Sequence, residues 1–364
     1  MRRPSWAAVC QHWDAAAHSG AAGHTAGRRH PAPRPDVTIH QRIIDQRRGP
    51  ALRITFIVNA VASSVTARRR VIIHKALSAD HEVTLAETSR RGHATRLALS
   101  AARDGADVVV VLGGDGTLNE AANGLVGTDT ALAALPGGST NVFARILGLP
   151  DDPVDAAGVT LEALAAGSVE PVGLGVVEGR YFLFHCGVGF DAAVVEAVER
   201  RGPWKRWAGH PLFVMAAVET WWRTDRRRPP LLVRGPDGTE LSRGFLTVVL
   251  NASPYTYLGN RPLDLVPGLD LHTPLAAVTL RRLGLGSLAP VLGRALAGRR
   301  LEASSAVDVV RDLKALEIEA DPAQPHQVDG DDLGACRRLR FAWEPDVLNL
   351  VVPPHRELRD PLGG

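Results

Sequence analysis

Short apolar runs alternate with helical patterns through the first half of the chain. We predict buried parallel strands at residues 52–59 (LRITFIVN), 81–86 (HEVTLA), 107–112 (DVVVVL) and 131–135. Between them, apolar positions at helical spacing predict helices at residues 67–79, 92–104, 118–125 and 141–147. Strands that alternate with helices indicate right-handed crossovers and a parallel sheet, in which ligands bind at the carboxyl ends of the strands.

The pattern changes after residue 170. Short alternating runs separated by Gly and Pro predict strands at residues 172–177, 181–186, 244–251, 275–280, 306–310 and 315–320. A long helical insert interrupts them at residues 192–224. The second half is therefore expected to be mostly antiparallel β structure.

Charge separates the first 50 residues from the rest. They hold eight Arg, no Lys and three Asp, so this segment carries +5, whereas the whole chain carries +3 and the other 314 residues about −2. We interpret this segment as a disordered extension that arises from a start codon placed too early, with an Arg-rich transit peptide as the alternative. Because the other 314 residues carry no excess positive charge, a nucleic-acid partner is not expected.

Cysteine usage and hydropathy bear on the compartment. The three scattered cysteines form neither a disulfide framework nor a zinc ligand set, which is typical of a reducing cytoplasm. The sequence contains no uncharged apolar run long enough to cross a membrane.

Residues 112–120 (LGGDGTLNE) carry the sharpest chemical signal. Paired glycines directly after a strand allow close approach of a ligand, and the free N–H groups of such a turn, with the dipole of the following helix, hold phosphate oxygens. A carboxylate inside the turn, Asp115, suggests a bridging Mg²⁺ or a role in positioning a hydroxyl. The alternative is a tight turn in which Asp115 caps the helix.

Residues 136–141 (PGGSTN) form a second turn directly after a strand. Its hydroxyl groups and free N–H groups are suited to a second phosphate site, although Ser139 or Thr140 would serve equally as a helix N-cap. Two such turns on neighbouring strand ends are a stronger indication of phosphate binding than either turn alone.

Three motifs together resemble the diacylglycerol kinase-like family, which includes sphingosine kinases and bacterial soluble lipid kinases. They are GGDGTLNE at 113–120, PGGSTNVFAR at 136–145 and GFDA at 189–192. The resemblance extends from residue 52 to about residue 352. GGDGT alone is shared with NAD kinases and, more loosely, with phosphofructokinases, whereas PGGSTN followed by FAR looks like the lipid branch.

The resemblance implies an α/β fold with two domains. An N-terminal Rossmann-like parallel-sheet nucleotide domain of the NAD kinase/diacylglycerol kinase type would precede a C-terminal, mostly antiparallel β-sandwich domain. The predicted boundaries are 51–172 for the nucleotide domain, 173–334 for the lipid-substrate domain and 335–364 for a segment that returns to the first domain. ATP would lie between the domains. The residues that match the family's ATP-binding positions are Asn59, Ala60, Val61, Ala62, Ser63, Thr88, Gly113, Gly114, Asp115, Gly116, Thr117, Leu118, Asn119, Gly138, Ser139, Thr140 and Asn141.

The resemblance also implies catalytic carboxylates in residues 327–331 (QVDGD), where the family normally has Asp-Gly-Glu. Asp329 is the first choice for the general base that deprotonates a lipid hydroxyl, with Asp331 and Asp115 as the other candidates. Asp115 is also expected to contact the Mg²⁺ that accompanies ATP. The alternative for Asp329 and Gly330 is an ordinary hairpin turn.

Many bacterial members hold a second, structural Mg²⁺ in an Asp-rich loop. The corresponding residues here are 266–270 (VPGLD), with Pro267 where the liganding Asp would stand. Although Asp264 and Asp270 lie nearby in the sequence, we do not expect this second metal site.

Residues 203–228 concentrate Trp and basic side chains at the two ends of an apolar stretch. Such a segment favours the membrane–water interface or covers a lipid pocket, and a buried helix with Trp core residues is the alternative. From this region we expect Trp204 and Trp207 to contact lipid. Asp191 matches a family position near the pocket, with a helix N-cap as its alternative.

These features predict an ATP-dependent lipid kinase that works in the cytoplasm and associates peripherally with the inner face of the membrane. Its acceptor would be a lipid alcohol, diacylglycerol first, giving phosphatidic acid. The alternatives are an NAD kinase and a non-catalytic nucleotide- or lipid-binding regulator of the same fold. An edge strand of the β domain would permit a homodimer.

Overall fold

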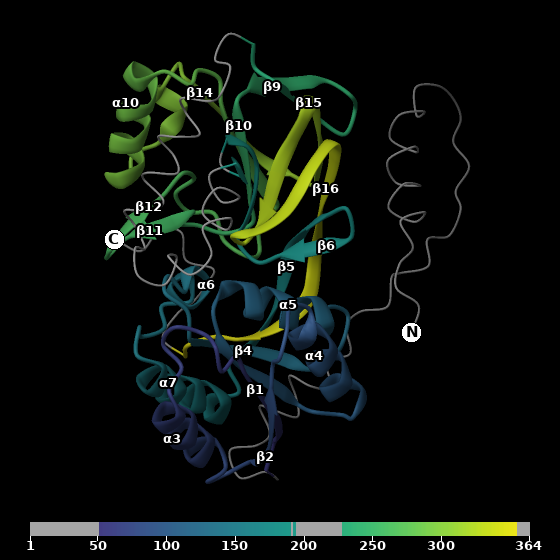
Figure 1. The fold of residues 1–364 in the computed structure, drawn as a ribbon, viewed down its shortest axis with the longest axis vertical. Coiled ribbons are helices and arrows are strands. Elements are labelled where there is room, and N and C mark those ends of the chain that lie inside the picture. Colours follow the sequence, from purple (N-terminus) through teal and green to yellow (C-terminus); the bar gives the residue numbers. More distant parts are fainter. Residues whose placement is uncertain (1–50, 191, 194–227, 355–364) are drawn as a thin grey trace, which may run out of the picture.

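Four parallel strands form the lower part of the molecule in Figure 1, a computed structural model that describes residues 51–190, 192–193 and 228–354. These strands are β1 (Arg53–Val58), β2 (Glu82–Glu87), β3 (Val108–Gly113) and β4 (Ala131–Pro136). They lie in the order β4-β3-β1-β2, and each neighbouring pair is parallel. All side chains of β3 and β4 are buried, as expected of central strands with helices on both faces.

Helices cover both faces of this parallel sheet. They are α3 (Ala67–Leu77), α4 (His93–Arg103), α5 (Asp115–Leu125), α6 (Val142–Ile146) and α7 (Pro153–Ala166). Because side chains alternate along a strand, Phe56 of β1 packs in the cluster that contains α3 and α7, while Ile57 packs in the cluster that contains α4 and α5. The predicted Rossmann-like region is confirmed, with α7 as a helix that the sequence patterns did not predict.

Antiparallel strands make up the upper part of Figure 1. They are β5 (Val169–Val177), β6 (Arg180–Phe182), β7 (His185–Gly189), β8 (Leu231–Arg234), β9 (Glu240–Gly244), β10 (Leu246–Leu250), β13 (Leu275–Leu280), β14 (Val307–Leu313), β15 (Ala315–Val328) and β16 (Asp331–Val351). A separate hairpin pairs β11 (Thr256–Leu258) with β12 (Arg261–Leu263). The predicted antiparallel second region is confirmed.

The long strand β16 joins the two parts into one sheet. It pairs with β15 and β5 in antiparallel fashion and, at Leu350, lies parallel to Leu132 of β4. Apart from β11 and β12, the described strands therefore form a single 14-stranded sheet. The register of β16 against β5 shifts between Glu344 and Leu348, where Asp346 has a positive φ of 52°. This bulge lets one strand serve two differently oriented sheets.

The prediction of one strand at residues 181–186 is wrong. The ladder breaks at Leu183 and Phe184, between β6 and β7. The physical reason is that the backbone N–H groups of these two residues donate to the carboxylate of Asp329, at 2.7 Å and 3.1 Å, instead of to a neighbouring strand.

One helix packs on the outside of the antiparallel part. Helix α10 (Leu285–Leu296) follows β13 and precedes a short 3₁₀ turn, η2 (Leu301–Ala303). Within the described ranges, every helix falls short of the length and apolarity that a membrane crossing requires. The predicted extension at 1–50 lies outside the described residues, as does almost all of the predicted insert at 192–224.

Candidate active site

The two glycine turns meet at the carboxyl edge of the parallel sheet. Gly113, at the end of β3, pairs with Pro136, at the end of β4, and the chain then turns sharply in both places. A Cβ atom on Gly138 would lie 2.8 Å from the Cα atom of Gly114, so a side chain at Gly138 would push the two turns apart. The glycines are therefore required by the close approach of two backbones.

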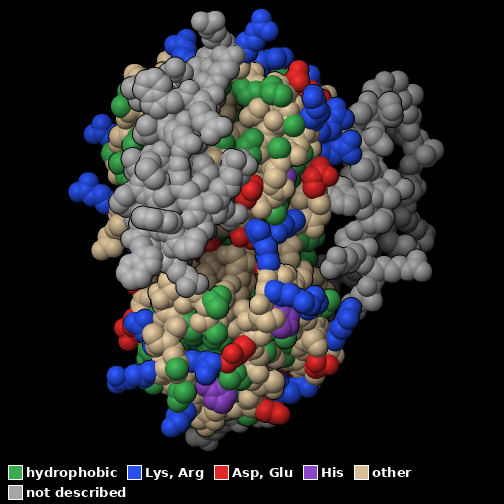
Figure 2. All heavy atoms as spheres, viewed as in Figure 1, with side chains coloured by type: hydrophobic (Ala, Val, Ile, Leu, Met, Phe, Trp, Pro, Cys, Tyr) green, Lys and Arg blue, Asp and Glu red, His purple; other side chains and the backbone are tan. Residues whose placement is uncertain are grey.

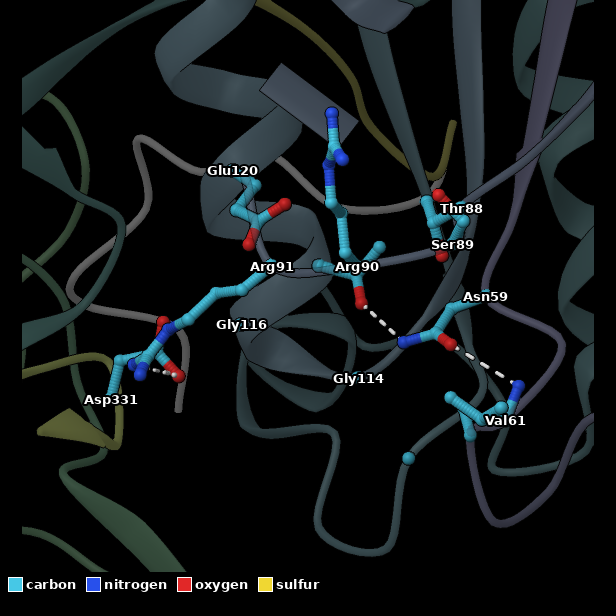
Figure 3. A pocket seen from close by; sticks show the side chains of 13 residues that line it. Asn59, Val61, Thr88, Ser89, Arg90, Arg91, Gly114, Gly116, Glu120 and Asp331 are labelled. Atoms are coloured by element: carbon cyan, nitrogen blue, oxygen red, sulfur yellow. Dashed lines mark hydrogen bonds and ion pairs between the residues drawn. The ribbon is translucent and has the colours of Figure 1, made fainter. Parts of the chain in front are cut away.

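The turn after β1 is fastened to both glycine turns. The Asn59 side-chain amide donates to Thr117 Oγ1 at 2.9 Å, and Asn59 Oδ1 accepts from the backbone N–H of Val61 at 3.2 Å (Figure 3). The backbone N–H of Ser64 donates to Gly137 O at 2.9 Å, and the Ser64 hydroxyl donates to the Gly138 carbonyl at 3.1 Å. Three strand ends thus form one connected rim.

Asp115 points at the second turn. Its two carboxylate oxygens accept from the backbone N–H groups of Val142 and Phe143, each at 3.0 Å, and thereby cap α6. Burial raises the pKa of Asp115, while the hydrogen bonds from Phe143 and Val142 act in the opposite direction. Asn141, in the left-handed region with φ 49°, bonds both the N–H and the carbonyl of Gly138, at 2.7 Å and 3.0 Å. Both polar side chains therefore hold the shape of the turns.

A cavity of about 450 Å³ opens above these turns, in the hollow that crosses the middle of the face shown in Figure 2. Its lining combines residues that follow each of the four parallel strands with Glu120 of α5 and one carboxylate from the antiparallel part. The lining residues are Asn59, Val61, Ala62, Thr88, Ser89, Arg90, Arg91, Gly114, Gly116, Thr117, Glu120, Gly138 and Asp331.

Asp331 is held between two guanidinium groups. Arg91, which follows β2, lies 3.3 Å from its Oδ1 (Figure 3), and Arg180 of β6 lies 3.0 Å from its Oδ2. Arg180 also donates to Asn119 Oδ1 through Nη2 at 2.8 Å. The cavity wall is therefore a charged network that joins the parallel and antiparallel parts, with one arginine on the cavity side of the carboxylate.

Asp329 lies behind this wall and is buried. Its Oδ2 accepts from Asn119 Nδ2 at 2.8 Å and from the N–H of Leu183 at 2.7 Å, while its Oδ1 accepts from the N–H groups of Phe184 and His185, each at 3.1 Å. Burial raises its pKa to about 6 against the effect of these four donors. Asp329 itself has a positive φ of 48°, so the turn at 329–330 is bent into this position.

The structure separates the predicted site residues into two groups. Eight predicted ATP-binding residues and Asp331 line the cavity. Four others lie behind the lining. Asp115 and Asn141 accept hydrogen bonds from backbone N–H groups of the second turn and α6. Asn119 accepts from Arg180 and donates to Asp329. The others do not line it among the described residues, and they are Ala60, Ser63, Gly113, Leu118, Ser139 and Thr140. Asp191, Trp204 and Trp207 lie outside the described residues.

Sequence reasoning missed four lining residues. Ser89, Arg90 and Arg91 follow Thr88 in the turn after β2, and the two adjacent arginines close to a strand end were the available signal. The fourth, Glu120, accepts hydrogen bonds from the N–H groups that begin α4, at Gly92 (2.6 Å) and Ala94 (3.2 Å). Its contribution is to dock α4 against α5.

The loop that corresponds to the Asp-rich metal loop of many family members, for which no metal site was expected, lies within the described residues. Asp264 accepts a hydrogen bond from the Ser253 hydroxyl at 2.5 Å and one from the N–H of Val266 at 3.1 Å, and burial raises its pKa. Asp270 accepts from the N–H of His272 at 2.9 Å. Among the described residues, no group of three or more His, Cys, Asp or Glu side chains gathers at metal-binding distances.

Comparison with known proteins agrees with the motifs. Residues 53–177 match the family model "Diacylglycerol kinase catalytic domain". Diacylglycerol kinase of Bacillus subtilis (strain 168) is 37% identical over 121 residues, which cover 32% of this chain and 39% of that protein. A protein of Chromohalobacter salexigens named "Probable lipid kinase YegS-like" is 32% identical over 186 residues, which cover 50% of this chain and 57% of that protein. The matches thus span between two fifths and three fifths of these relatives.

Solved structures share the fold. Two crystal structures of proteins assigned as diacylglycerol kinases from Bacillus anthracis str. Sterne have TM-scores of 0.68 and 0.63, at 22% and 21% identity. Each covers 84% of this chain, and the matches cover 97% and 99% of those chains. Residues 53–177 of this protein thus match the diacylglycerol kinase catalytic domain, as the motifs of its two glycine turns predicted.

Proposed function

We propose that the protein is an ATP-dependent lipid kinase that transfers the γ-phosphoryl group to a lipid hydroxyl, with diacylglycerol as the acceptor and phosphatidic acid as the product. The observation that carries this proposal is the cavity that the ends of the four parallel strands line together with Asp331. Phosphoryl transfer needs a cradle for phosphates, cationic groups and a nearby carboxylate, and this cavity combines all three.

The glycine turns are the proposed ATP site. Gly114 and Gly138 approach so closely that no side chain stands between them. The N–H groups at the start of α5, at Gly116 and Thr117, would then face a triphosphate. Arg91 lines the same cavity and would contact the phosphates as a bidentate donor. We propose that Asn59 and Thr117 fix the β1 turn against the nucleotide.

Mg²⁺ that accompanies ATP would neutralise phosphate charge. Asp115, the predicted ligand, directs both carboxylate oxygens to the backbone of α6. Asp331 lines the cavity, and it is therefore the carboxylate that we propose to face the metal.

Asp329 remains the proposed general base. Its pKa of about 6 suits a carboxylate that must take up a proton near neutral pH. To reach it, the lipid hydroxyl would replace the Asn119 amide, which lies at its Oδ2. Asp329 would accept the hydroxyl proton, the lipid oxygen would bond to the γ-phosphorus, and ADP would leave with the bridging oxygen.

The test is phosphate transfer from labelled ATP in the presence of Mg²⁺, with diacylglycerol in detergent micelles and NAD⁺ in parallel. Label in the organic phase that Asp329→Asn abolishes supports the proposal. Label on NAD⁺ alone would identify an NAD kinase, and ATP binding without transfer to either acceptor would identify a regulator.

Asp331→Asn separates the two carboxylates in the same assay. If Asp331 places Arg91 and the metal while Asp329 is the base, Asp331→Asn raises KM for ATP, whereas Asp329→Asn lowers kcat and leaves nucleotide binding intact. We further propose that the enzyme acts in the cytoplasm at the inner face of the membrane, where its acceptor is found.

A further inference from the structure

Helix α10 exposes a face without a polar side chain. Its outward positions are Gly286, Ala289, Pro290, Leu292 and Gly293, and Leu292 is 46% exposed. The only charged residue within the helix is Arg294. A surface helix ordinarily places charged residues opposite its buried stripe, so this face is unlike that of a helix in contact with water alone.

The other surface helices of the described residues follow the ordinary pattern. Helix α3 exposes Arg68 and Lys75, helix α4 exposes Arg96 and Arg103, and helix α7 likewise exposes two carboxylates. Helix α3 also exposes Val71 and Ile72, but together with these charged residues. Among α3, α4, α7 and α10, an outward face without an exposed charged side chain is therefore particular to α10.

Arginines flank α10 at both ends. Residues 281–300 read RRLGLGSLAPVLGRALAGRR and contain five Arg and no acidic residue. Arg281, Arg282, Arg299 and Arg300 are exposed, and Arg281 lies 3.5 Å from Asp308. Arg and Lys side chains also project from the outline of the molecule on the side where Figure 1 places α10 (Figures 1 and 2).

Packing fixes which face of α10 is outward. Leu288, Val291 and Ala295 lie on the opposite side and pack against the buried cluster of β10 and β13. The backbone N–H of Asp264 donates to the Ala295 carbonyl at 3.2 Å, and Arg294 Nε donates to the Arg300 carbonyl at 3.1 Å. The apolar face and the terminal arginines are therefore presented together by a docked helix.

We propose that α10 is a docking element for an anionic lipid bilayer. Its apolar face would lie at the acyl boundary, and the arginine pairs at its ends would contact anionic headgroups. A second copy of the chain is a poorer partner, because antiparallel pairing of two α10 helices would set arginine pairs against arginine pairs. The physiological purpose of this surface, access to a lipid acceptor, rests on the proposed function, but the binding itself does not require turnover.

The test is flotation of the full-length protein, without nucleotide, with vesicles of phosphatidylcholine alone and vesicles that also contain phosphatidylglycerol. We expect binding to the anionic vesicles that weakens with added salt. Arg299→Gln/Arg300→Gln should weaken it about 25-fold, from roughly 5-fold per arginine. Leu292→Asp should weaken it at least ~10-fold. The matched controls are Arg96→Gln/Arg103→Gln on α4 and Val71→Asp on α3.

Equal binding by the α10 variants and the wild type, or no binding of the wild type to anionic vesicles, would overturn the inference. So would α10 variants that turn a dimer into a monomer in sedimentation while vesicle binding is unchanged. Circular dichroism confirms folding, and Leu292→Ser replaces Leu292→Asp if the latter is unfolded. Kinase activity on micellar substrate is read separately, so its absence would count against the proposed function and leave the vesicle result standing.

Discussion

Asp329 provides a direct test of how burial and hydrogen bonding compete at one carboxylate. Burial raises its pKa from 3.8 to about 6, although the N–H groups of Leu183, His185 and Phe184 and the side chain of Asn119 each favour the charged form. The perturbation that isolates this competition is Asp329→Asn, which removes the titration and retains the size of the side chain.

The magnitude follows from the two pKa values. Because the folded protein holds the Asp329 proton more tightly than the unfolded chain, the stabilisation from this group is fully present below pH 3.8 and is lost as pH rises through about 6. Linkage then gives about 1.4 kcal/mol more stability at about pH 5 than at about pH 7.5 from this group alone. The same contribution is absent from Asp329→Asn.

The assay is denaturant unfolding of both proteins at these two pH values. All other groups titrate in both proteins, so the wild type should gain about 1.4 kcal/mol relative to the variant on acidification. The exposed Asp80 gives the control variant, Asp80→Asn, which should follow the wild type. The reasoning would be refuted if the difference in unfolding free energy between the wild type and Asp329→Asn were the same at both pH values, or changed in the opposite direction. The four donors would then balance or outweigh the effect of burial on the pKa.

Three further substitutions test the site and its surroundings. Gly138→Ala should weaken binding of a fluorescent ATP analogue at least ~10-fold, because the new Cβ would lie 2.8 Å from the Gly114 Cα atom. Unchanged affinity would show that the two turns can separate freely. Arg180→Gln removes a charge-assisted contact to Asp331 and should lower kcat/KM about tenfold, with wild-type kinetics as the contrary result. Gly293→Ala should raise stability by about 0.5–1 kcal/mol in thermal unfolding, because its Cβ would face open space within a helix, and a loss would indicate a hidden contact.

The parallel sheet and its turns were predictable because their signals are local. A run such as the four valines at 108–111 is too apolar for an exposed position, and the glycines that follow it mark the turn directly. The helix start at α5 is similarly encoded within a few residues. The resemblance to a kinase family then depends on these same local motifs.

The charged wall of the cavity was not predictable, because its members are brought together only by the tertiary fold. Arg91, Arg180 and Asp331 come from three separate parts of the chain, and their sequence neighbourhoods do not indicate that they meet. The burial of Asp329 is of the same kind, since three of its donors are backbone groups of residues 183–185, and any residue type other than proline supplies such a donor. Strand β16 escaped prediction because it contains Pro345 and many charged residues.

The shared strand β16 also has a consequence for the order of folding. Leu350 supplies the neighbour of Leu132 at the edge of the parallel sheet, although more than half of the chain separates them. During synthesis, β4 would therefore leave the ribosome long before its partner and present an open strand edge in the interim. Such long-range pairing slows folding and prolongs exposure to misassembly. The cell would need to protect the parallel half until β16 has also been translated.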